Sequence, residues 1–485
     1  MVDDHRDEQL FAVDVTPLET EEETPTGGVN KTFRRYDPHQ QFLVPPSLDD
    51  WLPENHLARF VSDLVEEVID LEPFLASYKE VRGFPPYDPR LMLKILLYGY
   101  STGVRSSRAI EKACSGDIAF RWLAANEAPD FRSIARFRRR HLTALRELFR
   151  TSLLLCKEAG MVRLGTVALD GTKVRASASR RKAMSYRHLT EKEQILAAEV
   201  DDLLHDAEVT DSREDKALGK NRRDDDLPEE LARRGHRLEV MRKAKADLEA
   251  RARNDAADKA RKAGEAKGLD EEMIEEHAAV AAANATPKPT AQASFTDPDA
   301  RIMKTADGSF HYCYNAQAVV DEAHQVVIAT TLTNRSADCP ELPSLLDQVE
   351  ENTGVTPKTL LADAGYFSED NVAATETRKV DPLIATGRLR HGEEPPPVPR
   401  GRIAHGLSAK QRMARKLRTK PGRAGYKRRK AIVEPVFGQI DTCHGGKAVL
   451  LRGLEAADAE WHLLVACHNL RKLYRYGGMA KTAAG

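Results

Sequence analysis

The sequence has no long apolar run, few cysteines and no secretion signal. A membrane-spanning helix needs about 20 consecutive apolar residues, and no stretch of this chain approaches that length. The six cysteines form no CxxC pair and lack the spacing of a disulfide scaffold, which fits a reducing cytoplasm. The first residues are acidic and have no apolar core. We therefore expect a cytoplasmic protein with no membrane partner.

A phosphate-binding loop of the form GxxxxGK[S/T] is also missing, which argues against an ATP-driven motor. The net charge is only −1, although 31% of the residues are charged. Acidic and basic residues are instead segregated along the chain. With 485 residues, the chain is long enough for about two to four domains with their own cores.

Two apolar stretches end in an aspartate that is closely followed by glycine. Residues 166–171 read TVALDG and residues 359–365 read TLLADAG. Each run is typical of a buried strand, and a carboxylate at its end would lie at the rim of a sheet. An isolated Asp-Gly is more often a turn. The repetition favours a shared site for Asp170 and Asp363.

A third carboxylate, Glu434, lies in a segment whose spacing is helical. Lys430, Glu434, Phe437 and Asp441 share one helical face, and Pro435 implies a kink or a helix start. Two strand-end aspartates and one helical glutamate form a suitable cage for two Mg²⁺ ions, with Mn²⁺ as a substitute. Two such ions, about 3.5–4 Å apart, activate a nucleophilic oxygen and stabilise the leaving oxygen of a phosphodiester.

An arginine-rich helix is predicted after Asp130, which is a suitable N-cap. Phe131, Ile134 and Phe137 fall on one face, and arginines populate the others. The pattern is similar to the second helix of a helix-turn-helix, although an ordinary amphipathic helix with a solvated basic face shows it too. The arginines expected to bind DNA are Arg132, Arg136, Arg138, Arg139 and Arg140.

Residues 388–430 contain fifteen Lys and Arg against two Glu. In a chain with almost no net charge, this segment is the strongest signal for a polyanion partner. The alternative is a solvated, disordered linker. Its end leads directly to Glu434 and would bring phosphate-binding charge there, through Lys427, Arg428, Arg429 and Lys430.

Composition divides the chain into four regions. Residues 1–34 predict a disordered acidic tail, and residues 35–162 a helical DNA-binding domain. Residues 163–179 and 301–485 alternate strand and helix patterns and form the catalytic domain. Residues 180–300, rich in alanine and charge, predict inserted helices rather than strands. The fold class is therefore α/β: a mixed sheet with flanking helices, preceded by an all-helical N-terminal domain and interrupted by a helical insertion.

Two further groups of residues could bind a metal, but we interpret both as structural. One group could bind zinc, but packing in an amphipathic helix explains its last two members. It consists of Cys443, His444, His462, Cys467 and His468. The other group consists of aspartates that we interpret as turn or capping residues. These are Asp297, Asp299, Asp321 and Asp338.

Several segments between about residues 36 and 475 together resemble the bacterial insertion-sequence transposases of the DDE type, which have an RNase H-like core. The clearest are VALDGTKVRASAS at 167–179, YNAQAVVD at 314–321, LADAGYFSEDN at 361–371 and VEPVFGQI at 433–440. The resemblance implies DNA cleavage and strand transfer.

The resemblance also implies a role for each predicted site residue. Asp170 and Asp363 would be the catalytic aspartates, and Glu434 the catalytic glutamate. An N-terminal domain would recognise the terminal inverted repeats in double-stranded DNA. The protein would act on these repeats and on target DNA as a homodimer or higher homo-oligomer, associated with the nucleoid through DNA.

One departure from the family pattern keeps alternatives open. A subgroup carries a Tyr, Arg, Glu, Lys signature, yet Asp441 stands where the lysine is expected. Tyr426 lies eight residues before Glu434 rather than seven, and Lys430 lies four before. Asp441 is also an alternative third carboxylate. The remaining functional alternatives are an RNase H-like nuclease without strand joining and a non-catalytic DNA-binding protein derived from a transposase.

Overall fold

The computed structural model describes residues 47–78, 85–179, 182–218, 229–387, 397–399 and 406–483. The predicted acidic tail at 1–34 and most of the first half of the basic segment lie outside the described residues. None of the described helices is long and apolar enough to cross a membrane. All six cysteines are free.

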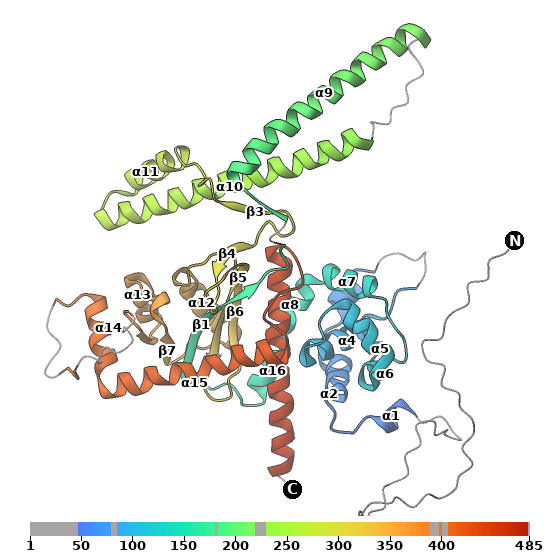
Figure 1. The fold of residues 1–485 in the computed structure, drawn as a ribbon. Coiled ribbons are helices and arrows are strands. Elements are labelled where there is room, and N and C mark those ends of the chain that lie inside the picture. The colour runs from blue at the N-terminus through green and yellow to red at the C-terminus, as the bar shows by residue number, and fades with distance from the viewer. Residues whose placement is uncertain are drawn as a thin grey trace, which may run out of the picture. The chain divides into compact units, whose positions relative to one another are not determined.

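Between residues 48 and 158, the residues that the structure describes form helices joined by loops (Figure 1). Asp88 caps α4 by accepting a hydrogen bond from the Arg90 amide, and Gly103 ends it in a left-handed conformation at φ 85°. Ten of the fourteen residues of α4 are buried, so this helix forms the centre of the group. The elements are α1 (Leu48–Trp51), α2 (Leu57–Asp63), the π-helical η1 (Leu64–Val68), α3 (Glu72–Leu75), α4 (Pro89–Thr102), α5 (Ser107–Gly116), α6 (Ile118–Leu123), α7 (Phe131–Arg140) and α8 (Leu142–Glu158).

A mixed sheet follows in the order β6–β5–β1–β7–β8, with β4 also paired to β5. β5 is antiparallel to β1 and β6, whereas β7 is parallel to β1 and β8 is parallel to β7. This order confirms the predicted RNase H-like α/β fold. The strands are β1 (Thr166–Arg175), β4 (Arg301–Lys304), β5 (Phe310–Asp321), β6 (Val327–Thr333), β7 (Thr359–Ala362) and β8 (Asp381–Ile384).

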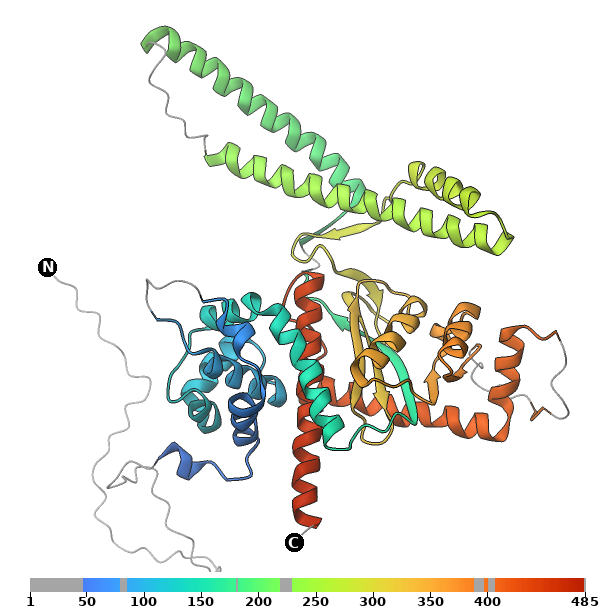
Figure 2. The ribbon, with the colours of Figure 1, turned by 180° about the vertical axis from the view of Figure 1, so that it is seen from behind.

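Helices cover the sheet, which explains why its strands are apolar almost throughout. α15 (Lys420–Cys443) contacts β1, β5, β7 and β8, while α12 (Leu342–Thr353) and α16 (Leu454–Ala483) contact β6. α8 and α16 run side by side, as the view from behind shows (Figure 2). Four further elements lie in this part of the chain: η3 (Cys339–Glu341), η4 (Ala364–Tyr366), α13 (Glu369–Thr377) and α14 (Ala409–Arg418).

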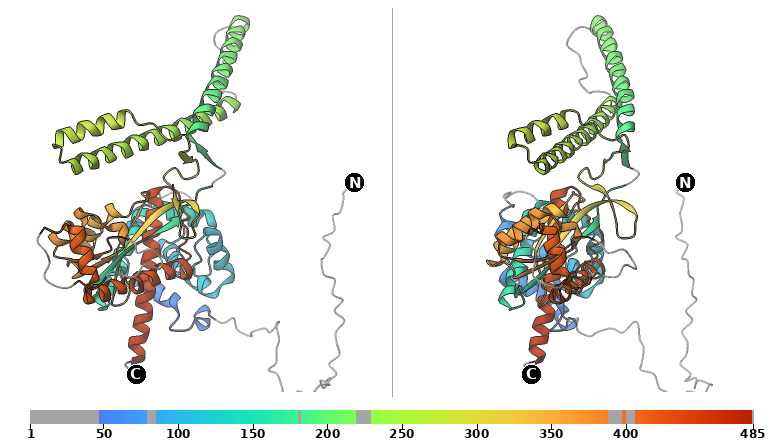
Figure 3. Two further views of the ribbon diagram at one scale, coloured as in Figure 1. Left: turned by 60° about the vertical axis from the view of Figure 1, so that its left-hand side comes forward. Right: turned by 90° about the vertical axis from the view of Figure 1, so that its left-hand side faces the viewer.

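The insertion after β1 has its own small core and takes no part in the mixed sheet (Figure 3). Its helices are α9 (Tyr186–Leu218), α10 (Glu229–Lys267) and α11 (Glu271–Ala283). Leu189 of α9 packs against Met241 and Leu248 of α10. The prediction of helices rather than strands is wrong at both ends, because β2 (Ala183–Ser185) pairs antiparallel with β3 (Gln292–Ser294). This pairing provides hydrogen-bond partners for the backbone N–H and C=O groups at the two ends of the insertion, where the chain leaves the mixed sheet and returns to it.

A buried ion pair joins the N-terminal helices to the sheet region. Arg105 Nη2 lies 2.9 Å from Glu460 Oε1, and both side chains are almost fully buried. The Tyr100 hydroxyl donates to the same oxygen at 3.0 Å, while the amides of Leu450 and Leu451 donate to Glu460 Oε2. Because all of these bonds converge on one carboxylate, Glu460 fixes the position of α4 against α16.

Candidate active site

Asp170 lies within β1 and does not end it. The strand continues to Arg175 because its pairing with β5 extends to Cys313, beyond the point where β7 stops. The prediction that Asp170 terminates a strand is therefore wrong, although its strand is central. Asp170 Oδ1 accepts the Gly171 amide at 2.9 Å, and Oδ2 accepts Arg429 Nη1 at 2.5 Å.

Asp363 directly follows β7, as predicted. In the parallel register, Leu169 lies opposite Ala362, so the next residue on each strand is a carboxylate. Asp363 caps the short turn η4 (Ala364–Tyr366) by accepting the Gly365 amide at 2.7 Å. Burial raises the pKa of Asp170, Arg429 opposes that rise, and the nearby charge of Asp363 adds to it. The fold thus brings the two aspartates together.

Glu434 lies on α15, but it does not join this pair. Its side chain is 57% exposed, and Lys430 Nζ lies 4.0 Å from it along the same helix. Val433 and Val436 occupy the buried face of the helix. Within the described ranges, no three His, Cys, Asp or Glu side chains are grouped so that they could hold a metal ion. The catalytic role of Glu434 stays a prediction.

Arg429 is the cation of this site, and it is not a free surface residue. It is 9% exposed and packs against Asp170. Its predicted role as a surface DNA contact is therefore corrected: the helical period that turns Ile432 and Val433 inward also turns Arg429 inward. Lys427 and Lys430 are exposed, and Arg428 pairs with Glu322.

Asp338 is the site residue that the sequence interpretation missed. Its Oδ1 accepts Lys173 Nζ at 3.1 Å, Asn315 Nδ2 at 2.7 Å and Gln317 Nε2 at 2.8 Å. Asp338 does occupy the N-cap position of η3, but its side chain makes no capping hydrogen bond there. β6 runs parallel to β1, so the chain after β6 emerges at the same edge as Asp363. β6 ends at Thr333, however, so the pattern that located Asp363, an apolar run that ends in an aspartate, does not point to Asp338.

Asp338 bonds Lys173 on one face of β1, whereas the side chain of Asp170 points to the opposite face. Successive side chains of a strand alternate, so Asp170 faces α15 while Lys173 faces the other side. The two aspartates Asp338 and Asp363 meet around Gly365. A Cβ on this glycine would lie 3.0 Å from Asp363 Oδ1 and 3.2 Å from Asp338 Oδ2. Asp338 therefore lies close to Asp363.

Gly171 has a packing role and does not form a turn. Gln317 lies opposite it on β5, and a Cβ at position 171 would be 2.5 Å from Gln317 Nε2. Because Gly171 carries no side chain, the side chain of Gln317 can lie across β1. Its Nε2 donates to Asp338, and its Oε1 accepts a hydrogen bond from the Tyr366 hydroxyl. Burial, together with the charges of the three aspartates, raises the pKa of Tyr366 well above its usual range, so this hydroxyl keeps its proton.

α7 has the predicted cap, since Asp130 accepts the amides of Arg132 and Ser133. Four of its five predicted DNA-binding arginines are exposed: Arg132, Arg136, Arg139 and Arg140. Arg138 is 5% exposed and donates to the Tyr100 hydroxyl, the Arg105 carbonyl and Ser107 Oγ. Its predicted DNA contact is corrected, because position 138 follows buried Ile134 by one helical turn.

The remaining predicted residues hold structural positions. Asp297, Asp299 and Asp321 accept backbone amides, as expected for turn or capping residues. Cys467 and His468 are buried in α16.

Two parts of the chain match known protein families. Residues 46–140 match a family described as Transposase domain (DUF772), and residues 285–470 match a family described as Transposase DDE domain. The second match contains Asp363 and Glu434. No curated protein and no solved structure matches the chain. With the RNase H-like sheet and its paired aspartates, these matches show that the chain belongs to the insertion-sequence transposases of the DDE type.

Proposed function

We propose that this transposase cuts double-stranded DNA at the terminal inverted repeats of its element and joins the freed ends to target DNA. The observation that carries the proposal is the adjacency of Asp170 and Asp363, which the parallel pairing of β1 and β7 sets up. Glu434 is proposed as the third catalytic carboxylate, from its place in the matched DDE domain.

The two aspartates have the donor chemistry of a divalent metal site. Carboxylate oxygens are the ligands that Mg²⁺ prefers, and Mn²⁺ accepts the same set. Asp363 Oδ1 accepts one backbone amide, and each Asp170 oxygen accepts one hydrogen bond, so lone pairs remain on both groups. Asp170 and Asp363 would hold two Mg²⁺ ions, and Glu434, which lies apart from this pair in the structure, is proposed as the third ligand. When bound, such ions activate an attacking oxygen and stabilise a leaving one.

The basic residues near the pair divide into two roles. Arg429 pairs with Asp170 and opposes the rise in its pKa that burial causes. Lys427 and Lys430 are exposed on α15, where they would bind DNA phosphates without regard to sequence. The exposed arginines of α7 would contact the terminal repeats. A transposase that joins two ends of one element needs two such sites, so we propose that it acts as a homodimer or larger homo-oligomer.

The deciding experiment uses a duplex that ends in the inverted repeats flanking the coding sequence, a target plasmid and Mg²⁺. Cleavage at the repeat end followed by joining to the plasmid is the expected result. Asp170→Asn and Asp363→Asn should lose both products and keep DNA binding. Cleavage without joining would indicate the nuclease alternative, whereas binding without cleavage by the unmodified protein would indicate a non-catalytic DNA-binding protein.

A further inference from the structure

A chain of buried hydrogen bonds links the turn that follows β7 to the middle of the sheet. Tyr366, the last residue of η4, is fully buried, and its hydroxyl donates to Oε1 of Gln317 on β5. Gln317 is also fully buried, and its Nε2 donates to Asp338 Oδ1 at 2.8 Å. The chain therefore runs from the turn that begins at Asp363 to a second carboxylate.

The chemistry of the groups fixes the direction of this chain. The Asp338 carboxylate pairs with Lys173 Nζ at 3.1 Å, and a carboxylate in an ion pair only accepts hydrogen bonds. The NH₂ group of Gln317 must therefore face Asp338, so its amide oxygen faces Tyr366 and the tyrosine hydroxyl donates. Each side chain of the network thus has one orientation, which makes the network rigid.

Tyr366 is held at its main chain as well as at its hydroxyl. Nδ2 of Asn371, on α13, donates to the Tyr366 carbonyl and to the Cys339 carbonyl, both at 2.8 Å. The Tyr366 amide donates to the Asp363 carbonyl at 3.3 Å, and Asp363 Oδ1 accepts the Gly365 amide at 2.7 Å. Because Asp363 and Tyr366 lie at the two ends of one short turn, holding the tyrosine limits where the aspartate can move.

The same chain also contacts the residue that follows the other catalytic aspartate. Gln317 lies opposite Gly171 in the pairing of β5 with β1, and a Cβ at position 171 would lie 2.5 Å from Gln317 Nε2. A larger residue at this position would therefore displace the amide. One network thus holds the turn of Asp363 and packs against the strand of Asp170.

We propose that Tyr366 and Gln317 are positioning residues, which hold Asp363 at the distance from Asp170 that divalent metal binding requires. The inference rests on the proposed function for the metal. A two-metal site needs carboxylates placed so that the ions lie about 3.5–4 Å apart. Loss of a group that orients a metal ligand typically weakens metal affinity by about 10–100-fold.

The test is Tyr366→Phe in the full chain, with Mn²⁺ binding measured by electron paramagnetic resonance of the free ion in the absence of DNA. The ring still fills its buried site, so the variant loses only the hydroxyl bond to Gln317. Mn²⁺ affinity should fall by about 10-fold or more. Excess Mn²⁺ should restore most of the cleavage rate on a repeat-ended duplex, because both aspartates are intact.

Tyr314→Phe is the matched control. Tyr314 is also fully buried on β5, and its hydroxyl donates to Asp297 Oδ1 at 2.7 Å. It lies opposite Val174, which is about 13 Å along β1 from Asp170. Urea unfolding without metal should show comparable losses of stability for the two variants, while only Tyr366→Phe loses Mn²⁺ affinity. An equal loss of affinity in both would assign the effect to general loosening and overturn the inference.

Gly171→Ala disturbs the same network without removing a hydrogen-bonding group. Its methyl group should displace the Gln317 amide and lower Mn²⁺ affinity as Tyr366→Phe does. The double variant should lose less affinity than the product of the two single effects, because both act through one chain. Gly235→Ala on α10, where no described atom lies within 4 Å of the added Cβ, should leave the affinity unchanged.

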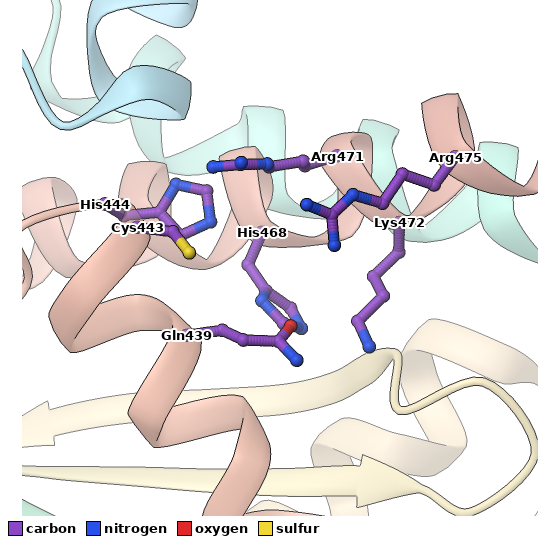
Figure 4. Close-up of a pocket in the computed structure, with 7 residues that line it drawn as sticks. All are labelled: Gln439, Cys443, His444, His468, Arg471, Lys472 and Arg475. Carbon is purple, nitrogen blue, oxygen red and sulfur yellow. The ribbon is translucent and has the colours of Figure 1, made fainter.

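A second control concerns metal binding elsewhere on the protein. Imidazoles are common metal ligands, and His444 and His468 lie together where α15 meets α16, with ring centroids 6.1 Å apart (Figure 4). Three basic side chains of α16 line the same hollow, which disfavours a cation there. His468→Gln should therefore leave Mn²⁺ affinity unchanged, whereas Asp170→Asn and Asp363→Asn should abolish it.

Equal Mn²⁺ affinity in Tyr366→Phe, Gly171→Ala and the unmodified protein overturns the inference. Failure of the proposed function looks different. In that case Mn²⁺ binding depends on Asp170, Asp363 and Tyr366 as expected, but no repeat-ended duplex is cut. An unmodified protein that binds no Mn²⁺ would overturn both.

Discussion

Arg429 and Asp170 are separated by 259 residues in the sequence, and Nη1 of the arginine lies 2.5 Å from Oδ2 of the aspartate. The arginine is the cation that pairs with this largely buried carboxylate in the middle of β1. Arg428, the preceding residue, pairs with Glu322 in a half-exposed position. These two neighbouring ion pairs offer a matched comparison.

Arg429→Gln should destabilise the protein by about 3 kcal/mol in the absence of divalent metal, because it leaves Asp170 buried without a partner. Arg428→Gln should cost less than about 1 kcal/mol, since its pair is exposed to solvent. Adding Asp170→Asn to Arg429→Gln should restore much of the loss. Urea unfolding measures all three. Equal costs for the two single variants would refute a special role for the buried pair.

The third carboxylate is tested by comparing Glu434→Gln with Asp441→Asn. Each change keeps the shape and removes one negative oxygen. Glu434→Gln should abolish cleavage of a repeat-ended duplex in Mg²⁺, whereas Asp441→Asn should slow it far less. Both variants should bind DNA as the unmodified protein does. Normal turnover by Glu434→Gln and failure of Asp441→Asn would transfer the role to Asp441.

Asp338→Asn should lower the cleavage rate by about 10–100-fold, as expected for a residue that positions metal-binding groups. All three donors bond Oδ1, so an amide oxygen can still accept from them, but the change removes the negative charge that pairs with Lys173. The apparent affinity for Mg²⁺ should weaken in parallel, which a purely structural change would not cause. Asp307→Asn, in an exposed turn, is the control and should leave both values unchanged. An active Asp338→Asn with normal Mg²⁺ dependence would exclude the positioning role.

Acid should destabilise the protein through the buried imidazole of His468. Its pKa is lowered to about 3 by burial and by His444, so the unfolded state takes up the proton first. The free energy of unfolding is therefore at its full value above the unfolded pKa of about 6.5, and it falls as the pH is lowered toward the folded pKa. Between pH 7 and pH 5 the unmodified protein should lose about 2 kcal/mol more than His468→Gln. Parallel pH curves for the two proteins would rule out this origin.

The sequence predicted those parts of the site that depend on local pattern. Asp363 could be placed because an apolar run ends at it and parallel strands end at one edge. The position of Asp170 within β1 could not, because the strand continues only through its pairing with β5. Asp338 was missed because no apolar run leads directly to it.

The prediction that every cation of the two basic helices contacts DNA did not allow for buried arginines. Arg138 and Arg429 were grouped with their exposed neighbours because a run of cations looks uniform in sequence. Both are buried against partners far away in the chain, Tyr100 and Asp170. The helical period indicates that both arginines could be buried, since each arginine lies one turn from an apolar residue of the buried face. Only the tertiary partner decides whether such a position buries an apolar or a charged side chain.

The exposed cations of α15 and α7 should have separable effects on DNA binding. Lys427→Gln and Lys430→Gln should each weaken binding to every duplex and reduce the log–log salt slope by about 0.9, because each neutralises a phosphate. Arg136→Gln and Arg139→Gln should instead narrow the gap between repeat and scrambled duplexes, by about 1–3 kcal/mol for each base contact that is lost. Titrations at several salt concentrations give both quantities. If the unmodified protein binds repeat and scrambled DNA equally, α7 is not a recognition helix, and its arginines belong with the lysines of α15 as general phosphate contacts.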